Sequence, residues 1–232
     1  MNRSRIVIKA VLVALLTTVM ASQVMAAFTL SGTRFIYEEG KKNISFEVKN
    51  NMPETYGGQV WINNTTQNKT GVYMVPSPPF FKISGKGKQI VRIMNVNPAL
   101  PQDRESLFWL NVQELPPKPK TEDGNMLAIA MNTQVKLIYR PKAIIDGRKN
   151  AEKRLSLITR DGKIWIDNPT PYYFAIIKVM SHGKEVKLPS SAAQALTEFA
   201  PKSAVNTGIS GLSTISVEAI NDWGGVEKYE IQ

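Results

Sequence analysis

The sequence contains no cysteine and only one histidine, His182. Without cysteine, the chain can form no disulfide bond, no thiolate metal site and no thiol nucleophile. With one histidine, it cannot build a metal site from several histidines, and any serine–histidine pair would depend on His182 alone. We therefore expect no metal ion and no other cofactor.

The sequence also lacks an apolar run long enough to cross a membrane. The run at 10–21 has 12 residues, whereas a spanning helix needs about 20. Arg3, Arg5 and Lys9 precede this run without any acidic residue, and small residues follow it. This order is typical of a secretory signal peptide, which we assign to residues 1–26, and no membrane span is expected.

The chain is basic, but its positively charged residues are not clustered. The net charge is +10, and removal of residues 1–26 would leave 26 basic and 19 acidic residues, a net charge of +7. The lysines are scattered, and no basic helix or arginine cluster occurs, so nucleic acid is not an expected partner. Exposed, solvated strand faces would account for this surplus of positive charge, and binding to an acidic partner is the alternative.

Short runs of alternating apolar and polar residues fill the chain, which is 43% hydrophobic. In the run 44–49, Ile44, Phe46 and Val48 fall on one face, as in a half-buried strand. Turn residues such as Gly, Pro and Asn separate the runs, as in a β-sandwich. The expected strands lie at 44–49, 59–62, 89–93, 106–112, 126–139, 154–157, 163–167, 173–179, 214–220 and 226–231.

A polar stretch at 146–150 divides these runs into two sets, each of a length that fits one sandwich. We therefore predict two β-sandwich domains joined by a linker. The segment 190–199 is the one ambiguous region, because its apolar spacing fits a helical turn while the flanking prolines fit a surface loop.

A search for catalytic groups finds no convincing set. The neighbouring carboxylates at 38–39 and 122–123 lie in turn-like polar stretches, where adjacent residues do not converge. No arrangement of nucleophile, base and oxyanion donors is evident, so the sequence does not predict an enzyme.

Charged residues inside apolar strands are more informative. Arg34 lies in the strand-like run 33–37, and Lys136 and Arg140 lie in the run 134–141. Such a charge must be paired, bind an anion or extend into solvent. The residues alone leave these alternatives open.

The predicted strand at 126–139 has a second unusual feature. Leu127, Ile129 and Met131 form one apolar row, which follows the proline- and lysine-rich segment 116–125. This row could be ordinary core, or it could be an exposed edge that accepts a partner strand.

Several motifs, in this order after a signal peptide, resemble the PapD-like periplasmic chaperones of the chaperone–usher pathway. They are 33–37 (Thr-Arg-Phe-Ile-Tyr), 79–81 (Pro-Phe-Phe) with 89–93 (Gln-Ile-Val-Arg-Ile), 103–112 (Asp-Arg-Glu-Ser-Leu-Phe-Trp-Leu-Asn-Val), 135–141 (Val-Lys-Leu-Ile-Tyr-Arg-Pro), 168–173 (Asn-Pro-Thr-Pro-Tyr-Tyr) and 221–225 (Asn-Asp-Trp-Gly-Gly).

The resemblance covers almost the whole chain after the signal peptide, and it implies an all-β fold. Two immunoglobulin-like β-sandwich domains would form an L-shaped arrangement with a cleft between them. The N-terminal domain, 27–145, would carry the donor strand, and the C-terminal domain would span 150–232. With no cysteine and a short segment at 117–125, the chain resembles the short-loop subgroup of this family.

The function implied by the resemblance is not enzymatic. Such a chaperone binds and stabilises pilin subunits in the periplasm, donates a β-strand to them and delivers them to an outer-membrane usher. By motif position, the donated row is Leu127, Ile129 and Met131, and the cations that anchor the C-terminal carboxylate of the pilin are Arg34 and Lys136.

The resemblance also implies an interdomain ion network of Glu105, Arg140 and Asp222. One question of geometry follows, because in an unbroken strand Lys136 faces away from the row that ends at Met131. A bulge, a twist or a change of sheet partner would reconcile the two.

Two further possibilities stay open. The exposed donor strand would also allow a self-capping homodimer of the empty chaperone. The alternative function is a two-domain, immunoglobulin-like extracellular adhesin or binding module, which would share the sandwiches but give no reason for Arg34 and Lys136.

Overall fold

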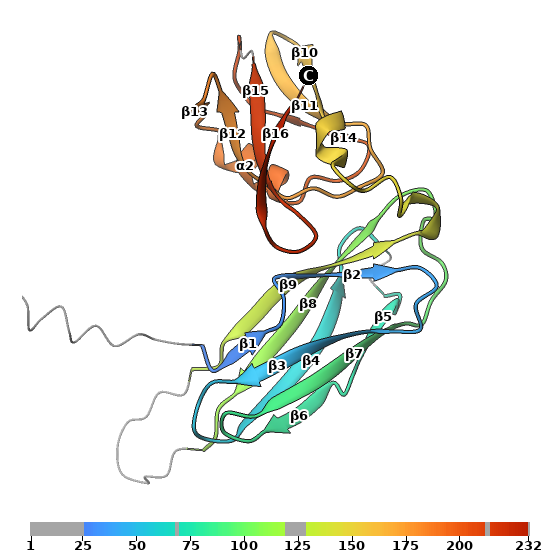
Figure 1. Cartoon of the computed structure of the whole chain (residues 1–232), viewed down its shortest axis with the longest axis vertical. Coiled ribbons are helices and arrows are strands. Elements are labelled where there is room, and N and C mark those ends of the chain that lie inside the picture. The colour runs from blue at the N-terminus through green and yellow to red at the C-terminus, as the bar shows by residue number, and fades with distance from the viewer. Residues whose placement is uncertain (1–25, 68–69, 119–128, 212–213, 232) are drawn as a thin grey trace, which may run out of the picture.

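The computed structural model describes residues 26–67, 70–118, 129–211 and 214–231. The expected signal peptide therefore lies outside the described residues, except for Ala26, and so does Leu127. Within these ranges the chain forms two β-sandwiches at an angle to each other (Figure 1). The predicted all-β, L-shaped fold is confirmed.

The first sandwich packs a four-stranded sheet, in the order β1-β3-β7-β5, against a five-stranded sheet, in the order β2-β9-β8-β4-β6. The strands of the first sheet are β1 (Phe28–Leu30), β3 (Ile44–Asn50), β5 (Met74–Ser77) and β7 (Lys88–Asn95). Those of the second are β2 (Arg34–Glu38), β4 (Tyr56–Asn64), β6 (Phe80–Ile83), β8 (Ser106–Leu115) and β9 (Asn132–Arg140).

The second sandwich packs a three-stranded sheet, in the order β10-β11-β14, against a four-stranded sheet, in the order β13-β12-β15-β16. Its first sheet contains β10 (Ser156–Arg160), β11 (Lys163–Asn168) and β14 (Ser203–Asn206). Its second contains β12 (Ile176–Ser181), β13 (Lys184–Glu185), β15 (Ile215–Ile220) and β16 (Val226–Glu230). Two short 3-10 helices, η1 (Lys142–Ile144) and η2 (Ala151–Arg154), lie between the sandwiches.

Each sandwich has its own apolar core, built from alternating residues of facing strands. In the first, Phe46 and Val48 of β3 point inward as their spacing predicts, and they pack with residues of β7 and β8. A third cluster joins the two sandwiches. Leu107 and Ile138, on the outer face of β8 and β9, pack against Tyr173 of the second domain. The five-stranded sheet is therefore covered on both faces where the second domain meets it.

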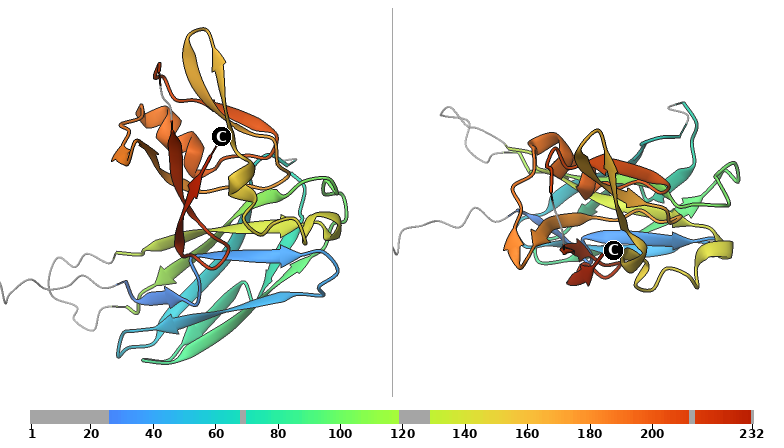
Figure 2. Two further views of the ribbon diagram at one scale, coloured as in Figure 1. Left: turned by 45° about the horizontal axis from the view of Figure 1, so that its top comes forward. Right: turned by 90° about the horizontal axis from the view of Figure 1, so that it is seen from above.

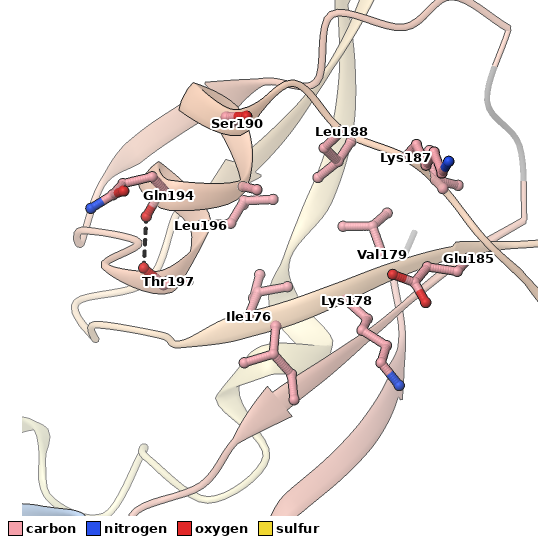
Figure 3. A pocket seen from close by; sticks show the side chains of 13 residues that line it. Ile176, Lys178, Val179, Glu185, Lys187, Leu188, Ser190, Gln194, Leu196 and Thr197 are labelled. Carbon is pink, nitrogen blue, oxygen red and sulfur yellow. Dashed lines mark hydrogen bonds between the residues drawn. The ribbon is translucent and has the colours of Figure 1, made fainter.

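The segment 190–199, which the sequence left ambiguous, forms the helix α2 (Ser190–Thr197). Leu196 and Ala192 of α2 are buried, which shows that its apolar face packs on the second core. A groove of about 490 Å³ lies between α2 and β12, with Ile176, Val179 and Leu196 among its lining residues (Figure 3). The C-terminal end of α2 reaches the domain junction.

No helix in the described ranges is long and apolar enough to cross a membrane.

The strand predicted at 126–139 differs from the observed one in its start. β9 begins only at Asn132, residues 126–128 lie outside the described ranges, and 129–131 have no strand geometry. The N–H group of Glu114 still donates to the carbonyl of Met131 at 2.9 Å, so the pairing with β8 continues one step beyond the strand. The strands expected at 154 and 173 also begin later, at Ser156 and Ile176.

β9 contains no bulge. Its register with β8 runs unbroken from Gln113↔Asn132 to Ser106↔Tyr139. Val135, Leu137 and Tyr139 therefore point into the first core, while Lys136 and Ile138 point toward the second domain. The opposite parity of Lys136 and Met131 is a property of a regular strand, and neither a bulge nor a change of partner is needed between Asn132 and Lys136.

Candidate functional site

The two candidate anchor cations are cross-strand neighbours. β2 runs parallel to β9, and its first residue, Arg34, pairs in register with Lys136. Both side chains line a small hollow at the domain junction. Its lining residues are Arg34, Leu107, Lys136, Ile138, Tyr173, Phe174, Ala175 and Glu198.

Lys136 is held between the domains. Its Nζ donates to the carbonyl oxygen of Thr197, the last residue of α2, and lies 5.9 Å from the centre of the Trp109 ring. Burial, together with the neighbouring charge of Arg34, lowers the pKa of Lys136 to about 8, and Glu198 partly opposes this shift. The ammonium group is therefore desolvated, with a carbonyl and an aromatic face as its neighbours and no carboxylate ion pair within the described residues.

Arg34 is held by the other edge of the second domain. Its Nη1 donates to the carbonyl oxygen of Ile220, the last residue of β15, at 3.0 Å. Its Nε is buried and has no hydrogen-bond partner among the described residues. Burial lowers the pKa of Arg34, and the charge of Asp222 acts in the opposite direction. An anion in the hollow would thus meet two cations whose charge is only partly compensated.

β9 has an open edge beside these cations. Because β2 begins at Arg34, it covers β9 only from Lys136 onward. The preceding residues, 132–135, pair with β8 on one side and with no other described strand on the other side. Ile129, which precedes this edge, is 67% exposed, and Met131 is 42% exposed. The two described members of the apolar row are therefore accessible.

The predicted ion network is assembled at the junction. Arg140 contacts Glu105 through Nε–Oε1 at 2.6 Å and Asp222 through Nη1–Oδ2 at 2.7 Å. The second oxygen of Glu105 accepts the N–H of Tyr173 at 2.7 Å. Glu105 and Arg140 are buried in the first domain, whereas Asp222 and Tyr173 belong to the second. The three charges thus lie across the interface in one chain of contacts.

The surroundings move the pKa values of the two carboxyls in opposite directions. Burial raises the pKa of Glu105, and the charge of Arg140 offsets this only in part. Burial also disfavours the charged form of Asp222, but its hydrogen bond and charge contact with Arg140 outweigh burial and lower its pKa. Asp222 is therefore the firmly ionised partner, and the charge of Glu105 depends on Arg140.

Sequence reasoning missed one ion pair next to this network. Arg148 and Glu152 form a buried bidentate pair, with distances of 2.8 and 3.0 Å, and Arg148 also lies 3.5 Å from Asp222. The stretch 146–150 had the composition of an exposed linker, but Arg148 is buried. The spacing of four residues between Arg148 and Glu152 was the available signal, and its burial could not be inferred without the fold.

Comparison with known proteins identifies the family. The N-terminal domain of PapD, a pili and flagellar-assembly chaperone, matches residues 27–145. The C-terminal domain of the pili assembly chaperone PapD matches residues 150–231.

Individual relatives agree with this result. The chaperone protein FanE of Escherichia coli is 47% identical over 215 residues, which are 92% of this chain and 94% of FanE. The crystal structure of the periplasmic chaperone SfaE is 30% identical, with a TM-score of 0.68 and coverage of 88% of this chain and 98% of that one.

A chain in the structure of the Salmonella enterica SafA pilin in complex with the SafB chaperone shares the fold, with a TM-score of 0.72 at 24% identity. It covers 89% of this chain and 96% of its own length. Together with the matches to both PapD domains, these similarities show that the chain belongs to the PapD family of pilus-assembly chaperones.

Proposed function

We propose that this chaperone captures pilin subunits in the periplasm by adding the edge of β9 to them, with Arg34 and Lys136 as the anchor for the C-terminal carboxylate of the pilin. The observation that carries this proposal is the open edge at 132–135, which ends against the two cations. Family membership supports the chaperone activity, and a chain in the complex of the SafA pilin with the SafB chaperone shares the fold.

The geometry sets the direction of the added strand. A strand beside 132–135 occupies the same row of the sheet as β2 and ends where β2 begins, at Arg34. If the C-terminus of the pilin lies there, the added strand must run in the same direction as β9. A carboxylate at this end would replace the carbonyls of Thr197 and Ile220 as the acceptor for the cations.

The apolar row then supplies the affinity. Burial of Ile129 and Met131 in a pilin would contribute about 1.5–3 kcal/mol each if complete. Main-chain hydrogen bonds along the edge would be tolerant of pilin sequence, while the fixed carboxylate sets the register. Register matters because a slip of one residue would turn every side chain of the added strand to the wrong face.

Replacement of Ile129 with aspartate is expected to block the capture of pilin subunits. The side chain is 67% exposed in the free chaperone, so the fold should tolerate the change, but a charge cannot enter an apolar groove without a large desolvation penalty. The measurement is a periplasmic pull-down of tagged chaperone, with bound proteins identified by mass spectrometry. Val72→Asp is the matched control, because Val72 is 63% exposed in the same domain and does not precede the β9 edge.

Small pilin-like subunits should be recovered on wild-type chaperone and on Val72→Asp, but not on Ile129→Asp. Normal recovery on Ile129→Asp would show that the row is not donated. A tagged protein found on the cell surface, without bound subunits, would instead favour the adhesin interpretation.

The affinity for pilin should fall as the pH rises above about 8. The pKa of Lys136 is about 8 in the free chaperone, and a bound carboxylate would raise it. The charged form is therefore needed for binding, and each further pH unit should weaken binding by about tenfold. Affinities at pH 7, 8 and 9 test this. Lys136→Arg is the control, because its guanidinium stays charged and should remove the pH dependence.

The remaining expectations belong to the same proposal. The pilin would be passed to an outer-membrane usher, and residues 1–26 would be removed as a signal peptide on export. Without a bound pilin, the exposed edge could pair with a second copy as a self-capping homodimer. Sedimentation of the empty chaperone and of Ile129→Asp would test the last point, since only the former should dimerise.

A further inference from the structure

Trp223 is the most exposed large apolar side chain in the described residues, at 94%. It lies in the turn between β15 and β16, at the end of the hairpin that reaches toward the first domain (Figure 1). Neither the donor edge nor the anchor pair involves it. Burial of an exposed indole against a partner is favourable, because it removes a large apolar surface from water.

The turn that carries Trp223 is held by side-chain and backbone hydrogen bonds. The side-chain Oδ1 of Asn221 accepts the N–H groups of Trp223 and Gly225 at 3.0 and 2.9 Å. The backbone closes the same turn, with Asn221 N to Gly225 O at 2.8 Å and Gly224 N to Asn221 O at 3.0 Å. The indole therefore projects from a fixed base, which lowers the conformational entropy lost on binding.

In the free chaperone the turn also contacts the first domain at three points. The carbonyl of Ile220 binds Arg34, and Asp222 binds Arg140. Gly224 lies so close to the start of β2 that a Cβ on it would be 2.5 Å from Oγ1 of Thr33. Figure 2 shows the hairpin end beside β2 and β9 in its left view. Trp223 thus stands beside the point where a strand added to β9 would end.

We propose that Trp223, together with the exposed Val226, forms an apolar rim that packs on an apolar side chain in the last residues of the bound pilin. This inference rests on the proposed function and adds a contact from the second domain. The carboxylate of the pilin would enter the hollow between Arg34 and Lys136. The residues just before it would then pass under the rim. Continuity of the rim with the anchor favours the pilin over another partner.

The rim would also add specificity. The cations select any free C-terminus, and the β9 edge accepts many sequences, because both contact the main chain or the carboxylate. An aromatic side chain instead binds most favourably to an apolar neighbour. Such residues contribute most of the binding energy of many interfaces. Pilins with an apolar residue near the C-terminus would therefore be preferred over chains that end in polar residues.

The test is a competition experiment with the pilin recovered in the pull-down. Tagged and untagged chaperones compete for this pilin, and the tagged form carries Trp223→Ala, Trp223→Phe or Ile177→Ala. Ile177 is an exposed apolar residue of the same domain on β12 and serves as the control. We expect about 30-fold weaker binding for Trp223→Ala, partial retention for Trp223→Phe and no change for Ile177→Ala.

A change in the pilin itself locates the contact. When the apolar residue nearest the carboxyl end of the pilin is changed to serine, Trp223→Ala should cause little further loss. Unchanged affinity of Trp223→Ala, or a loss that is the same with both pilin forms, would overturn the rim. Normal capture with loss of pilin transfer at the outer membrane would also overturn it, in favour of an usher contact.

Failure of the rim is distinguishable from failure of the proposed function. If Lys136→Ala does not bind the pilin while Trp223→Ala binds it normally, the anchor assignment is supported and only the proposed rim is refuted. If Lys136→Ala binds the pilin normally, the proposed anchor itself is wrong. The thermal unfolding of Trp223→Ala should match that of the wild type, because the indole is exposed.

Discussion

Replacement of Lys136 with alanine is expected to abolish the capture of pilin subunits while leaving the fold intact. The pilin carboxylate in the hollow would still contact Arg34 but would lose its contact with Lys136. Truncation of one partner of a buried, hydrogen-bonded charge pair costs about 2–5 kcal/mol of binding free energy. The affinity should therefore fall by a factor of roughly 30 to several thousand. A periplasmic pull-down with quantified pilin recovery measures this effect.

The stability of the Lys136→Ala protein should not fall with its function. The pKa of Lys136 is lowered, first by burial, which means that its charge is unfavourable in the free chaperone at neutral pH. Removal of the ammonium also removes its repulsion with Arg34, at the loss of one hydrogen bond to Thr197. Lys142→Ala is the matched control, an exposed lysine just beyond β9. Normal pilin recovery by Lys136→Ala would refute the anchor assignment.

The sequence could predict the fold because each sandwich depends on simple alternation. Phe46 and Val48 of β3 are buried as their period-two spacing requires, and the strands at 44–50, 88–95 and 106–115 form where that pattern occurs. The polar stretch at 146–150 predicted the division of the chain into two domains. The family resemblance then identified charged residues that alternation alone could not bring together.

The parts that the sequence could not predict depend on tertiary contacts. An apolar run predicts a strand at 126–139, but strand geometry also needs a partner. The strand register of β8 with β9 ends at Asn132, and one further hydrogen bond reaches Met131. The helix α2 contains no strong signal of its own and is stabilised by burial of Leu196. Arg148 looked solvated because the burial of its pair with Glu152 of η2 depends on the fold, which also brings Asp222 of the second domain next to it.

The parity of β9 shows how one regular strand serves two purposes. Leu137 and Tyr139 fill the core of their own domain, while Lys136 points toward the second domain from the opposite face. Met131 has the parity of the core residues, five positions before Lys136. Beyond the end of the first core, the same face of the chain is exposed, as the proposed donation of this row to a pilin requires.

Replacement of Arg140 with alanine is expected to give the largest loss of stability. Glu105 has a fully buried side chain, and without Arg140 its carboxylate keeps only the N–H of Tyr173 as a strong partner. An unpaired buried charge of this kind destabilises a protein by about 3–5 kcal/mol. Asp222 would also lose its contact with Arg140, so the junction between the domains should weaken. Denaturant unfolding at pH 7 measures the loss.

The pH dependence and a compensating substitution distinguish this cause from a general packing defect. Burial already raises the pKa of Glu105, and loss of Arg140 would raise it further. A carboxyl whose folded pKa lies above its unfolded value loses stability as the pH rises between the two, so Arg140→Ala should regain stability as the pH falls toward 5. The double variant Arg140→Met/Glu105→Gln, which removes both charges, should recover most of the loss at pH 7. A single variant that is destabilised equally at both pH values, or a double variant that is no better than the single one, would show that Glu105 is not the source of the instability.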